Sequence, residues 1–340
     1  MPPLVSAIVV NWNGKEYLEE CLQSLHAQTF SDFELILVDN GSTDGSIEHV
    51  QQDFPGWVRV LRNVRNEGFS GGNNRGIRAA SGKYIVLLNN DAQADPRWLE
   101  ELVRVAEENP RAGMLASKIY LQGGSNIIDN VGHLIYRDGL NRGRGRLEVD
   151  RGQYERTEEV FFPSGCAALY RREMLEEVGL FDEDFFAYGD DTDLGLKGRL
   201  AGWKCLYVPK AVVHHRYSQS SGAYSALKAF YVERNRVWIA VKFFPLPLLL
   251  ESPFFTFLRF ALQGYGALAG RGAAGRFSEA YSPGQLLRVL WNAYWAAFQG
   301  LPKMWKKRRE IKGRTRVSEA EIRSWFRRFG ISAREISWKD

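Results

Sequence analysis

Apolar runs alternate with amphipathic stretches along the first part of the chain, and each apolar run ends in polar turn residues. The runs at 5–10, 33–38, 58–61 and 84–88 have the length and composition of buried strands. Stretches such as 17–25, with apolar residues at helical spacing, separate them. Strands that alternate with helices predict a mostly parallel sheet, covered by helices on both faces, with a ligand crevice at one edge. We therefore expect an α/β fold.

The alternation continues less regularly to about residue 215. A helix is expected to begin at Asp95 and Pro96, as N-cap and first residue. A turn leads into a buried strand within 161–172, and further strands are expected at 203–209 and at 212–215. One sheet domain over residues 1–222 accounts for this pattern.

The pattern changes after residue 222. A helix is expected at 231–242, and the strongly apolar segment 243–269 is interrupted by three prolines and by charged residues. A membrane-spanning helix needs roughly 20 mostly apolar residues, whereas the longest run here without a polar or charged residue, 243–250, has eight. We therefore predict no transmembrane span and a helical region over 223–340.

Positive charge is concentrated in this helical region. Residues 301–340 hold 13 Lys or Arg against 5 Asp or Glu, whereas the whole chain has a net charge of +5. Basic residues at 303, 306, 307, 308 and 309 surround Trp305. Such a cluster suits an anionic membrane surface or nucleic acid, and a solvated helical face is the alternative. We expect no nucleic-acid partner, while a membrane surface and a homo-oligomer interface both stay open.

Composition limits the class of protein and its compartment. With 45% hydrophobic and 13% aromatic residues, the chain is globular rather than disordered. Cys21, Cys166 and Cys205 are too few and too scattered for a disulfide framework. The N-terminus lacks a basic region followed by an apolar signal core. We therefore expect a cytoplasmic protein, either free or peripheral on the inner face of the cell membrane.

Side chains with metal-binding chemistry follow two of the expected strands. The run 84–88 breaks into two asparagines and Asp91, and a carboxylate at the carboxyl end of a parallel strand suits a metal or a phosphate-bearing ligand. His214 and His215 end a later strand, and imidazole is a good ligand for manganese. The competing interpretations are a simple turn at Asp91 and a structural role for the histidines.

An acidic segment and a glycine-rich segment offer further candidates. Asp190, Asp191 and Asp193 open an expected helix, where acidic caps are favourable. Three acids exceed what capping needs, so one is a candidate general base. The segment 68–76 lacks the spacing of a dinucleotide fingerprint. Its glycines allow the backbone to approach a bulky ligand and its two asparagines offer donors and acceptors; a plain flexible loop is the alternative.

Taken together, these motifs form an ordered set. They are residues 10–14, 38–46, 66–76, 88–91, 179–182, 188–194 with 202–203, and His214 with the serines at 218, 220 and 221. From about residue 4 to about 222, the set resembles the family 2 inverting glycosyltransferases of GT-A fold. The likeness is strongest to bacterial rhamnosyltransferases that extend cell-surface polysaccharides.

The resemblance implies a role for each matching residue. Asp191 corresponds to the catalytic base, but Asp190 stands where a glutamate is usual, so the choice between the two is open. Asp91 corresponds to the last acid of the Asp-x-Asp metal motif. His214 is the better match for the distal metal ligand, with His215 as its rival. The implied donor-binding residues are Val10, Asn11, Asn13, Asp39, Asn40, Asn66, Gly71, Gly72, Asn73, Asn74, Asn89 and Asn90, and the implied acceptor-binding residues are Gly165 and Trp203. Asn89 also replaces the first acid of the metal motif.

The implied reaction is a single displacement. Asp191 takes the proton from an acceptor hydroxyl, and a divalent metal, Mn²⁺ or Mg²⁺, stabilises the departing nucleoside diphosphate. The implied donor is dTDP-rhamnose, with a UDP-hexose as the alternative. The implied acceptor is a glycan or a polyprenyl-linked sugar.

Two other classes of protein compete with this interpretation. A nucleotidyltransferase would normally carry a basic, glycine-rich loop after the first strand, where this chain has Asn-Trp-Asn-Gly at 11–14. A non-catalytic sugar-binding module would not need Asp39, Asp91 and Asp191 at strand ends and a helix start.

Overall fold

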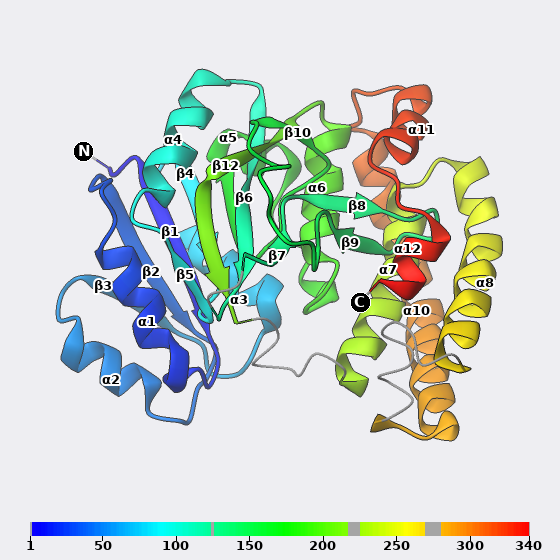
Figure 1. The fold of residues 1–340 in the computed structure, drawn as a ribbon, viewed down its shortest axis with the longest axis horizontal. Helices are drawn as coiled ribbons and strands as arrows, with labels where there is room; N and C mark the ends of the chain where they lie inside the picture. Colours follow the sequence, from blue (N-terminus) through cyan, green and yellow to red (C-terminus); the bar gives the residue numbers. More distant parts are fainter. Residues whose placement is uncertain (1, 124–125, 217–224, 269–279, 340) are drawn as a thin grey trace. The chain divides into compact units, whose positions relative to one another are not determined.

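The chain forms two compact units, shown as a ribbon in Figure 1. The computed structural model describes residues 2–123, 126–216, 225–268 and 280–339. The first unit comprises residues 1–133, 143–199 and 203–220, and the second comprises 134–142, 200–202 and 221–340. The second unit thus includes two short segments from earlier in the chain, which the sequence pattern did not indicate.

A ten-stranded mixed sheet forms the centre of the first unit (Figure 1). Its main path runs β10-β12-β6-β11-β4-β1-β2-β3. The strands are β1 Val5–Asn11, β2 Phe33–Asp39, β3 Val58–Arg62, β4 Tyr84–Leu88, β5 Ala92–Ala94, β6 Ala112–Leu121, β7 Ile128–Asn130, β10 Glu158–Val160, β11 Ala167–Arg171 and β12 Lys204–His215. A separate two-stranded pair consists of β8 His133–Ile135 and β9 Asn141–Gly143.

Strands β1 to β4 pair in parallel, as the alternation predicted, and β12 pairs in parallel with β6. Strand β11 enters antiparallel between β4 and β6, so β4, β1 and β6 end at the same edge. The two strands expected at 203–209 and 212–215 are one strand, β12, whose register shifts between Val208 and Val212. The predicted α/β fold is confirmed.

Helices lie on both faces of this sheet (Figure 1). They are α1 Lys15–His26, α2 Ser46–Asp53, α3 Gly68–Ala79, α4 Trp98–Glu108, α5 Arg172–Val178 and α6 Asp190–Leu200, with a 3₁₀ turn η1 at Glu183–Phe185. Alternate residues of β1, such as Val5 and Val9, join a buried core with Leu18 of α1 and Leu102 of α4. Residues of the opposite parity face the other side, where Ile8 meets α3. Helix α4 begins at Trp98 with Arg97 as its N-cap, two residues after the predicted start at Pro96.

The glycine-rich segment is helical rather than a ligand loop. Helix α3 already begins at Gly68. A Cβ at Gly72 would lie 2.6 Å from Val10 Cγ1, and one at Gly76 would lie 2.6 Å from Ile8 Cγ2. These two glycines therefore let α3 pack closely on β1, and the expectation that the segment admits a bulky ligand stays a prediction.

Within the described residues, five helices make up most of the second unit. They are α7 Ala226–Phe243, α8 Leu246–Leu268, α10 Pro283–Lys312, α11 Glu319–Arg328 and α12 Ala333–Trp338. Four of them start at a serine whose side chain accepts a hydrogen bond from a backbone amide of the first turn, the usual N-cap. Of the helices in the described ranges, none combines the length and the hydropathy of a membrane span.

A buried ion network ties the second unit together. Arg259 of α8 donates to Asp138 Oδ2 through Nε at 2.7 Å and pairs with Glu233 of α7 at 2.9 Å. Arg236 donates to Glu233 Oε2 at 2.7 Å, and Tyr294 of α10 accepts from Arg236. Asp138 is fully buried and the Arg259 side chain is 1% exposed. The network fixes segment 134–142 against α7 and α8.

Candidate functional site

The carboxyl ends of β1 and β4 meet at the point where the sheet reverses its strand order. The chain runs from β1 outward to β2 and β3, then crosses to β4 on the other side of β1. Ligands of open α/β sheets bind at such a switch point. Here Asn90 Nδ2 donates to Asn11 Oδ1 at 2.8 Å. A Cβ at Gly14 would lie 2.4 Å from Asn90 Nδ2, so glycine is required beside this amide pair.

The loop after β2 closes over the end of β1. Asn11 Nδ2 donates to Ser46 Oγ at 2.9 Å, and Asn13 Oδ1 accepts from the Thr43 amide at 2.8 Å. Asn13 holds a left-handed backbone with φ of 50°, a conformation that asparagine tolerates better than most residues. Asp39 accepts from the Ser42 amide at 3.1 Å and is 5% exposed. The predicted donor-binding residues Asn11, Asn13 and Asp39 are thus brought together.

Three other asparagines predicted to bind the donor make hydrogen bonds within the protein. Asn40, 2% exposed, donates to the Gly68 carbonyl at 2.9 Å and accepts from Asn63 at 2.7 Å. Asn73 donates to the Phe69 carbonyl within α3. Asn74, 1% exposed, donates to the Phe181 carbonyl and accepts from the Phe181 amide. Their amide groups position loops, and the expected donor contacts of Asn40, Asn73 and Asn74 stay predictions.

The remaining donor-binding candidates also have defined places. Asn66 accepts from the Gly68 amide at 2.8 Å and so closes the start of α3. Val10 packs on Gly72, and Gly71 faces the side chain of Glu67. The backbone of Asn89, the residue after β4, donates to the Cys166 carbonyl at 2.8 Å.

Asn74 joins α3 to the turn that precedes the acidic helix α6. Replacement by alanine leaves the buried Phe181 carbonyl and amide without these partners, so we expect a loss of roughly 1–3 kcal/mol in unfolding free energy. Arg78→Ala is a matched control, because Arg78 contacts the same Glu183 as Asn74 but is 61% exposed, and its loss is expected to stay below about 1 kcal/mol. Urea unfolding of both variants measures this; equal losses would contradict the assignment.

A buried chain of charges lies at the carboxyl ends of β4 and β12. His215 Nε2 lies 3.3 Å from Asp91 Oδ1, and His215 Nδ1 lies 2.9 Å from Asp129 Oδ2. Arg146 lies 2.5 Å from the other oxygen of Asp129. Burial alone would lower the pKa of His215, but Cys166 and hydrogen bonds to Asp129 and Asp91 raise that pKa well above its ordinary value. Imidazole and carboxylate therefore face each other in a site under a tenth exposed.

His214 does not belong to this chain of charges. Its Nε2 lies 3.4 Å from Asp95 Oδ1 and its side chain is 41% exposed. The ring stacks on Tyr120 with centroids 5.7 Å apart. Successive side chains of a strand point to opposite faces, so only one of the two histidines on β12 can face Asp91. The preference for His214 over His215 is therefore corrected. The serines at 218, 220 and 221 lie outside the described residues.

Asp191, the candidate base, stands in the first turn of α6. Its Oδ2 accepts from the Gly165 amide at 3.4 Å and lies 3.9 Å from His133 Nε2. The Asp191 side chain is 16% exposed, whereas Asp190 is 5% exposed and has one carboxylate oxygen without a hydrogen-bond partner. Burial and the neighbouring Asp191 charge raise the pKa of Asp190 well above its ordinary value. Of the two carboxyls, Asp190 is thus the one whose charged form burial disfavours.

One short loop connects Asp191 to the charges around Asp91. The Gly165 amide donates to Asp191, and the Cys166 carbonyl accepts from the Asn89 amide at 2.8 Å. The Cys166 thiol also interacts with His215. Two consecutive residues therefore contact the candidate base and His215, one of the candidate metal ligands.

Trp203 lies at the opposite end of the strands from Asp191, too far to contact an acceptor bound beside Asp191. It immediately precedes β12, whose other end carries His215. Its indole N–H donates to Glu177 at 2.8 Å, and its ring packs over Gly113 near the start of β6. The acceptor-binding prediction for Trp203 is corrected, whereas Gly165 lies beside Asp191.

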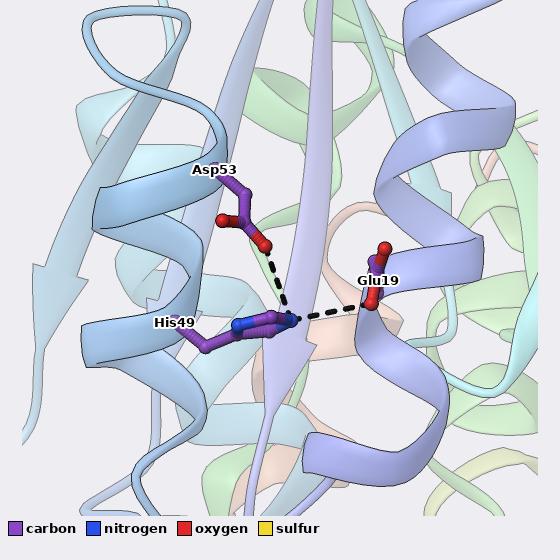
Figure 2. Close-up of side chains that lie close together, drawn as sticks. All are labelled: Glu19, His49 and Asp53. Atoms are coloured by element: carbon purple, nitrogen blue, oxygen red, sulfur yellow. Dashed lines mark hydrogen bonds and ion pairs between the residues drawn. The ribbon is translucent and has the colours of Figure 1, made fainter.

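A second group of potential metal ligands lies on α1 and α2 (Figure 2). His49 Nε2 is 3.2 Å from Glu19 and 3.2 Å from Asp53. The three side chains are between 34% and 45% exposed. Carboxylates at such exposure pair with histidine in solvent without an ion, and we assign this group no ligand.

Four residues near the site were not found from the sequence. Asp129, His133, Arg146 and Cys166 come from short strands and loops with no motif spacing. Burial lowers the pKa of His133 despite the nearby charges of Asp191 and Asp129. The only signal was at Arg146, which lies in the arginine- and glycine-rich stretch 137–151; that stretch has little apolar periodicity and could bind phosphates.

Comparison with known proteins gives concordant matches. The family model for glycosyl transferase family 2 matches residues 6–179. The N-acetylglucosaminyl-diphospho-decaprenol L-rhamnosyltransferase of Mycobacterium tuberculosis (strain ATCC 25618 / H37Rv) is 31% identical over 244 residues, covering 65% of this chain and 79% of that protein.

Two solved structures share the fold. The mannosyltransferase PcManGT of Pyrobaculum calidifontis, in complex with GDP-Man and Mn²⁺, has a TM-score of 0.55 and 18% identity, covering 90% of this chain and 88% of that one. GalNAc-T7 with UDP, GalNAc and Mn²⁺ has a TM-score of 0.60 and 18% identity, covering 77% of this chain and 51% of that one. The sheet and its helices have the GT-A fold that the sequence predicted.

Proposed function

Because the chain belongs to glycosyl transferase family 2, we propose that it moves a sugar, with inversion, from a nucleoside diphosphate donor to a hydroxyl of a lipid-linked glycan. One observation carries the proposal: Asp191 contacts Gly165, and His215, which faces Asp91, contacts Cys166, the next residue of the same loop. A general base and a cation-binding pair are the two parts that such a transfer needs on opposite sides of the sugar.

The residues divide the reaction between them. Asn11, Asn13 and Asp39 line the end of β1 and β2, where they bind the nucleotide. Asp191 takes the proton from the acceptor hydroxyl as that oxygen attacks the anomeric carbon, and the partly exposed side chain is within reach of a ligand. With one base and no protein nucleophile, the displacement is single and inverts the anomeric centre.

A divalent metal fits the Asp91–His215 pair. Carboxylate oxygen and imidazole nitrogen suit Mn²⁺, and the two donor atoms lie 3.3 Å apart in a buried site. Asn89 offers only a neutral amide where relatives have an acid, so Asp91 and His215 are the residues that hold the ion. Such an ion, when bound, neutralises the developing charge of the diphosphate leaving group.

The Mn²⁺ affinity of the two histidines should differ. His215→Ala removes the imidazole that faces Asp91, so we expect Mn²⁺ binding to weaken at least tenfold. His214→Ala, at the adjacent exposed position, should bind Mn²⁺ like the unmodified protein. Titration followed by the electron paramagnetic resonance of free Mn²⁺, with a nucleoside diphosphate present, measures both. A larger effect at His214 would reverse the assignment.

For the donor we propose dTDP-rhamnose and for the acceptor a polyprenyl diphosphate-linked sugar. The rhamnosyltransferase of M. tuberculosis, whose length this chain covers by 79%, supports rhamnose as the sugar and a polyprenyl diphosphate-linked acceptor. The proposed reaction belongs to cell-envelope polysaccharide synthesis. A UDP-hexose is the second candidate, since the resemblance extends to hexosyl-transferring relatives. Three buried free cysteines support a reducing, cytoplasmic location, with the enzyme peripheral on the inner face of the membrane.

The donor is tested by thermal shift against a panel of nucleotide sugars with Mn²⁺, followed by transfer to a polyprenyl diphosphate-linked N-acetylglucosamine. A true donor raises the melting temperature in proportion to its affinity. Rhamnosyl transfer with dTDP-rhamnose supports the proposal. Transfer from UDP-hexoses alone would replace the donor, and release of no nucleoside diphosphate from any sugar would refute the function.

A further inference from the structure

Helix α10 buries its small residues and exposes its aromatic ones. Ala293, Ala297 and Met304 are at most 1% exposed, and a Cβ at Gly300 would lie 2.5 Å from the Trp238 ring of α7. The opposite side carries large apolar side chains between 42% and 70% exposed: Leu287, Trp291, Trp295, Phe298 and Trp305. Their spacing of four, four, three and seven residues places them on one face. A helix of a soluble domain normally has the reverse arrangement.

Helix α8 repeats this arrangement in the same unit. Leu246, Leu250, Phe254, Phe257 and Tyr265 recur at helical spacing and are between 55% and 72% exposed. Its buried positions include Arg259, the centre of the ion network. Monomeric soluble proteins rarely expose apolar stripes of this extent, and those that do use them for interaction. We call the exposed faces of α8 and α10 the aromatic surface.

Basic side chains flank the aromatic surface on α10. Lys306, Arg309 and Lys312 are exposed: on the helical projection Arg309 falls within the stripe, and Lys306 and Lys312 lie on its two sides, each less than about a quarter turn from its centre. Trp305, Lys306 and Arg309 also line a groove of about 500 Å³ together with Val241, Leu301 and Pro302. An apolar groove with two cations at its rim matches an anionic amphiphile, whose phosphate meets the cations and whose chain meets the apolar wall.

We propose that the aromatic surface docks on an anionic lipid bilayer. Tryptophan and phenylalanine on one face of a helix, flanked by lysine and arginine, insert at the boundary between headgroups and acyl chains. Charge decides between this partner and a second copy of the chain. Residues 301–340 hold 13 basic against 5 acidic residues, so two copies of the surface would set like charges against each other, whereas an anionic leaflet complements them.

Vesicle flotation of the full chain tests the docking surface. We expect the protein to float with vesicles that contain phosphatidylglycerol and to remain largely unbound with phosphatidylcholine alone. The triple variant Trp291→Ser, Trp295→Ser, Phe298→Ser should bind anionic vesicles at least tenfold more weakly. Lys306→Gln with Arg309→Gln should weaken binding about 30-fold at low salt and less at high salt.

Two control variants test whether the loss of any exposed apolar or basic side chain weakens vesicle binding. Val64→Ser removes a fully exposed apolar side chain of the first unit, and Lys210→Gln removes an exposed cation on β12; both should bind like the unmodified protein. Equal flotation with neutral and anionic vesicles, or full binding by the triple variant, would overturn the proposal. A dimer in analytical ultracentrifugation that the triple variant dissociates, without vesicle binding, would assign the surface to a second copy instead.

Vesicle binding is independent of the proposed reaction. The inactive variant Asp191→Asn should float like the unmodified protein, since Asp191 belongs to the first unit. Failure of the transfer assay would therefore leave the docking result intact, and failure of flotation would leave the transfer result intact.

Discussion

Replacement of Asp191 by asparagine should lower the rate of sugar transfer by about a hundredfold to ten-thousandfold, the usual contribution of a general base. Asparagine preserves the shape and the hydrogen bond from the Gly165 amide but cannot take a proton from the acceptor hydroxyl. Donor binding, measured as the thermal shift produced by the nucleotide sugar, should be unchanged. Steady-state transfer rates at saturating donor and acceptor give the comparison.

Asp190→Asn is the matched control for this experiment. Burial and the Asp191 charge raise the pKa of Asp190, and an amide is a close substitute for a carboxyl whose neutral form is favoured. We therefore expect its transfer rate to stay within about tenfold of the unmodified enzyme. A lower transfer rate for Asp190→Asn than for Asp191→Asn would assign the general base to Asp190. A transfer rate of Asp191→Asn equal to that of the unmodified enzyme would show that Asp191 is not the general base.

Replacement of Arg259 by methionine should destabilise the protein by about 3–5 kcal/mol, because it leaves buried carboxylates without their cation. Arg259 is 1% exposed and contacts both Asp138 and Glu233. The matched control is Arg137→Met, whose guanidinium is 45% exposed and pairs with Glu251 at 3.3 Å; its effect should stay below about 1 kcal/mol. Urea unfolding followed by tryptophan fluorescence measures both. An unfolding midpoint of Arg259→Met equal to that of the unmodified protein would show that the network contributes no net stability.

The same network makes the free energy of unfolding depend on pH. Burial opposes ionisation of Glu233, but Arg236 and Arg259 outweigh it and lower its pKa from 4.5 to about 2. A carboxyl whose pKa is lower in the folded state stabilises that state above its unfolded pKa and loses the contribution as pH falls through the folded pKa. The corresponding loss, about 3 kcal/mol, should therefore develop between about pH 4.5 and 2.

The sequence predicted the sheet well because buried parallel strands are continuous apolar runs. The β1, β2, β3 and β4 segments were each located within one residue of their observed bounds. Periodicity could not show that residues 203–215 are a single strand, since Pro209 and Lys210 interrupt the apolar pattern where the register shifts. Contact with β6 on one side keeps the strand continuous.

The site was predicted less completely, because side-chain direction is set by tertiary structure. On β12 the alternation of faces ensures that His214 and His215 diverge, but only the pairing of β12 with β5 and β6 decides which one meets Asp91. The asparagines of α3 have the chemistry of ligand contacts, yet helix formation from Gly68 turns Asn74 towards the Phe181 turn. Asp129 reaches His215 across 86 residues, a separation that no local pattern encodes.

The contacts of Gly165 and Cys166 fix the separation between Asp191 and His215. One peptide unit separates the amide that holds Asp191 from the residue whose carbonyl and thiol meet Asn89 and His215. Inserting a single residue there would shift one group against the other by about 3.8 Å, more than a hydrogen-bonded proton transfer tolerates. Substitutions around the loop, unlike changes of its length, would leave the separation of the two groups unchanged.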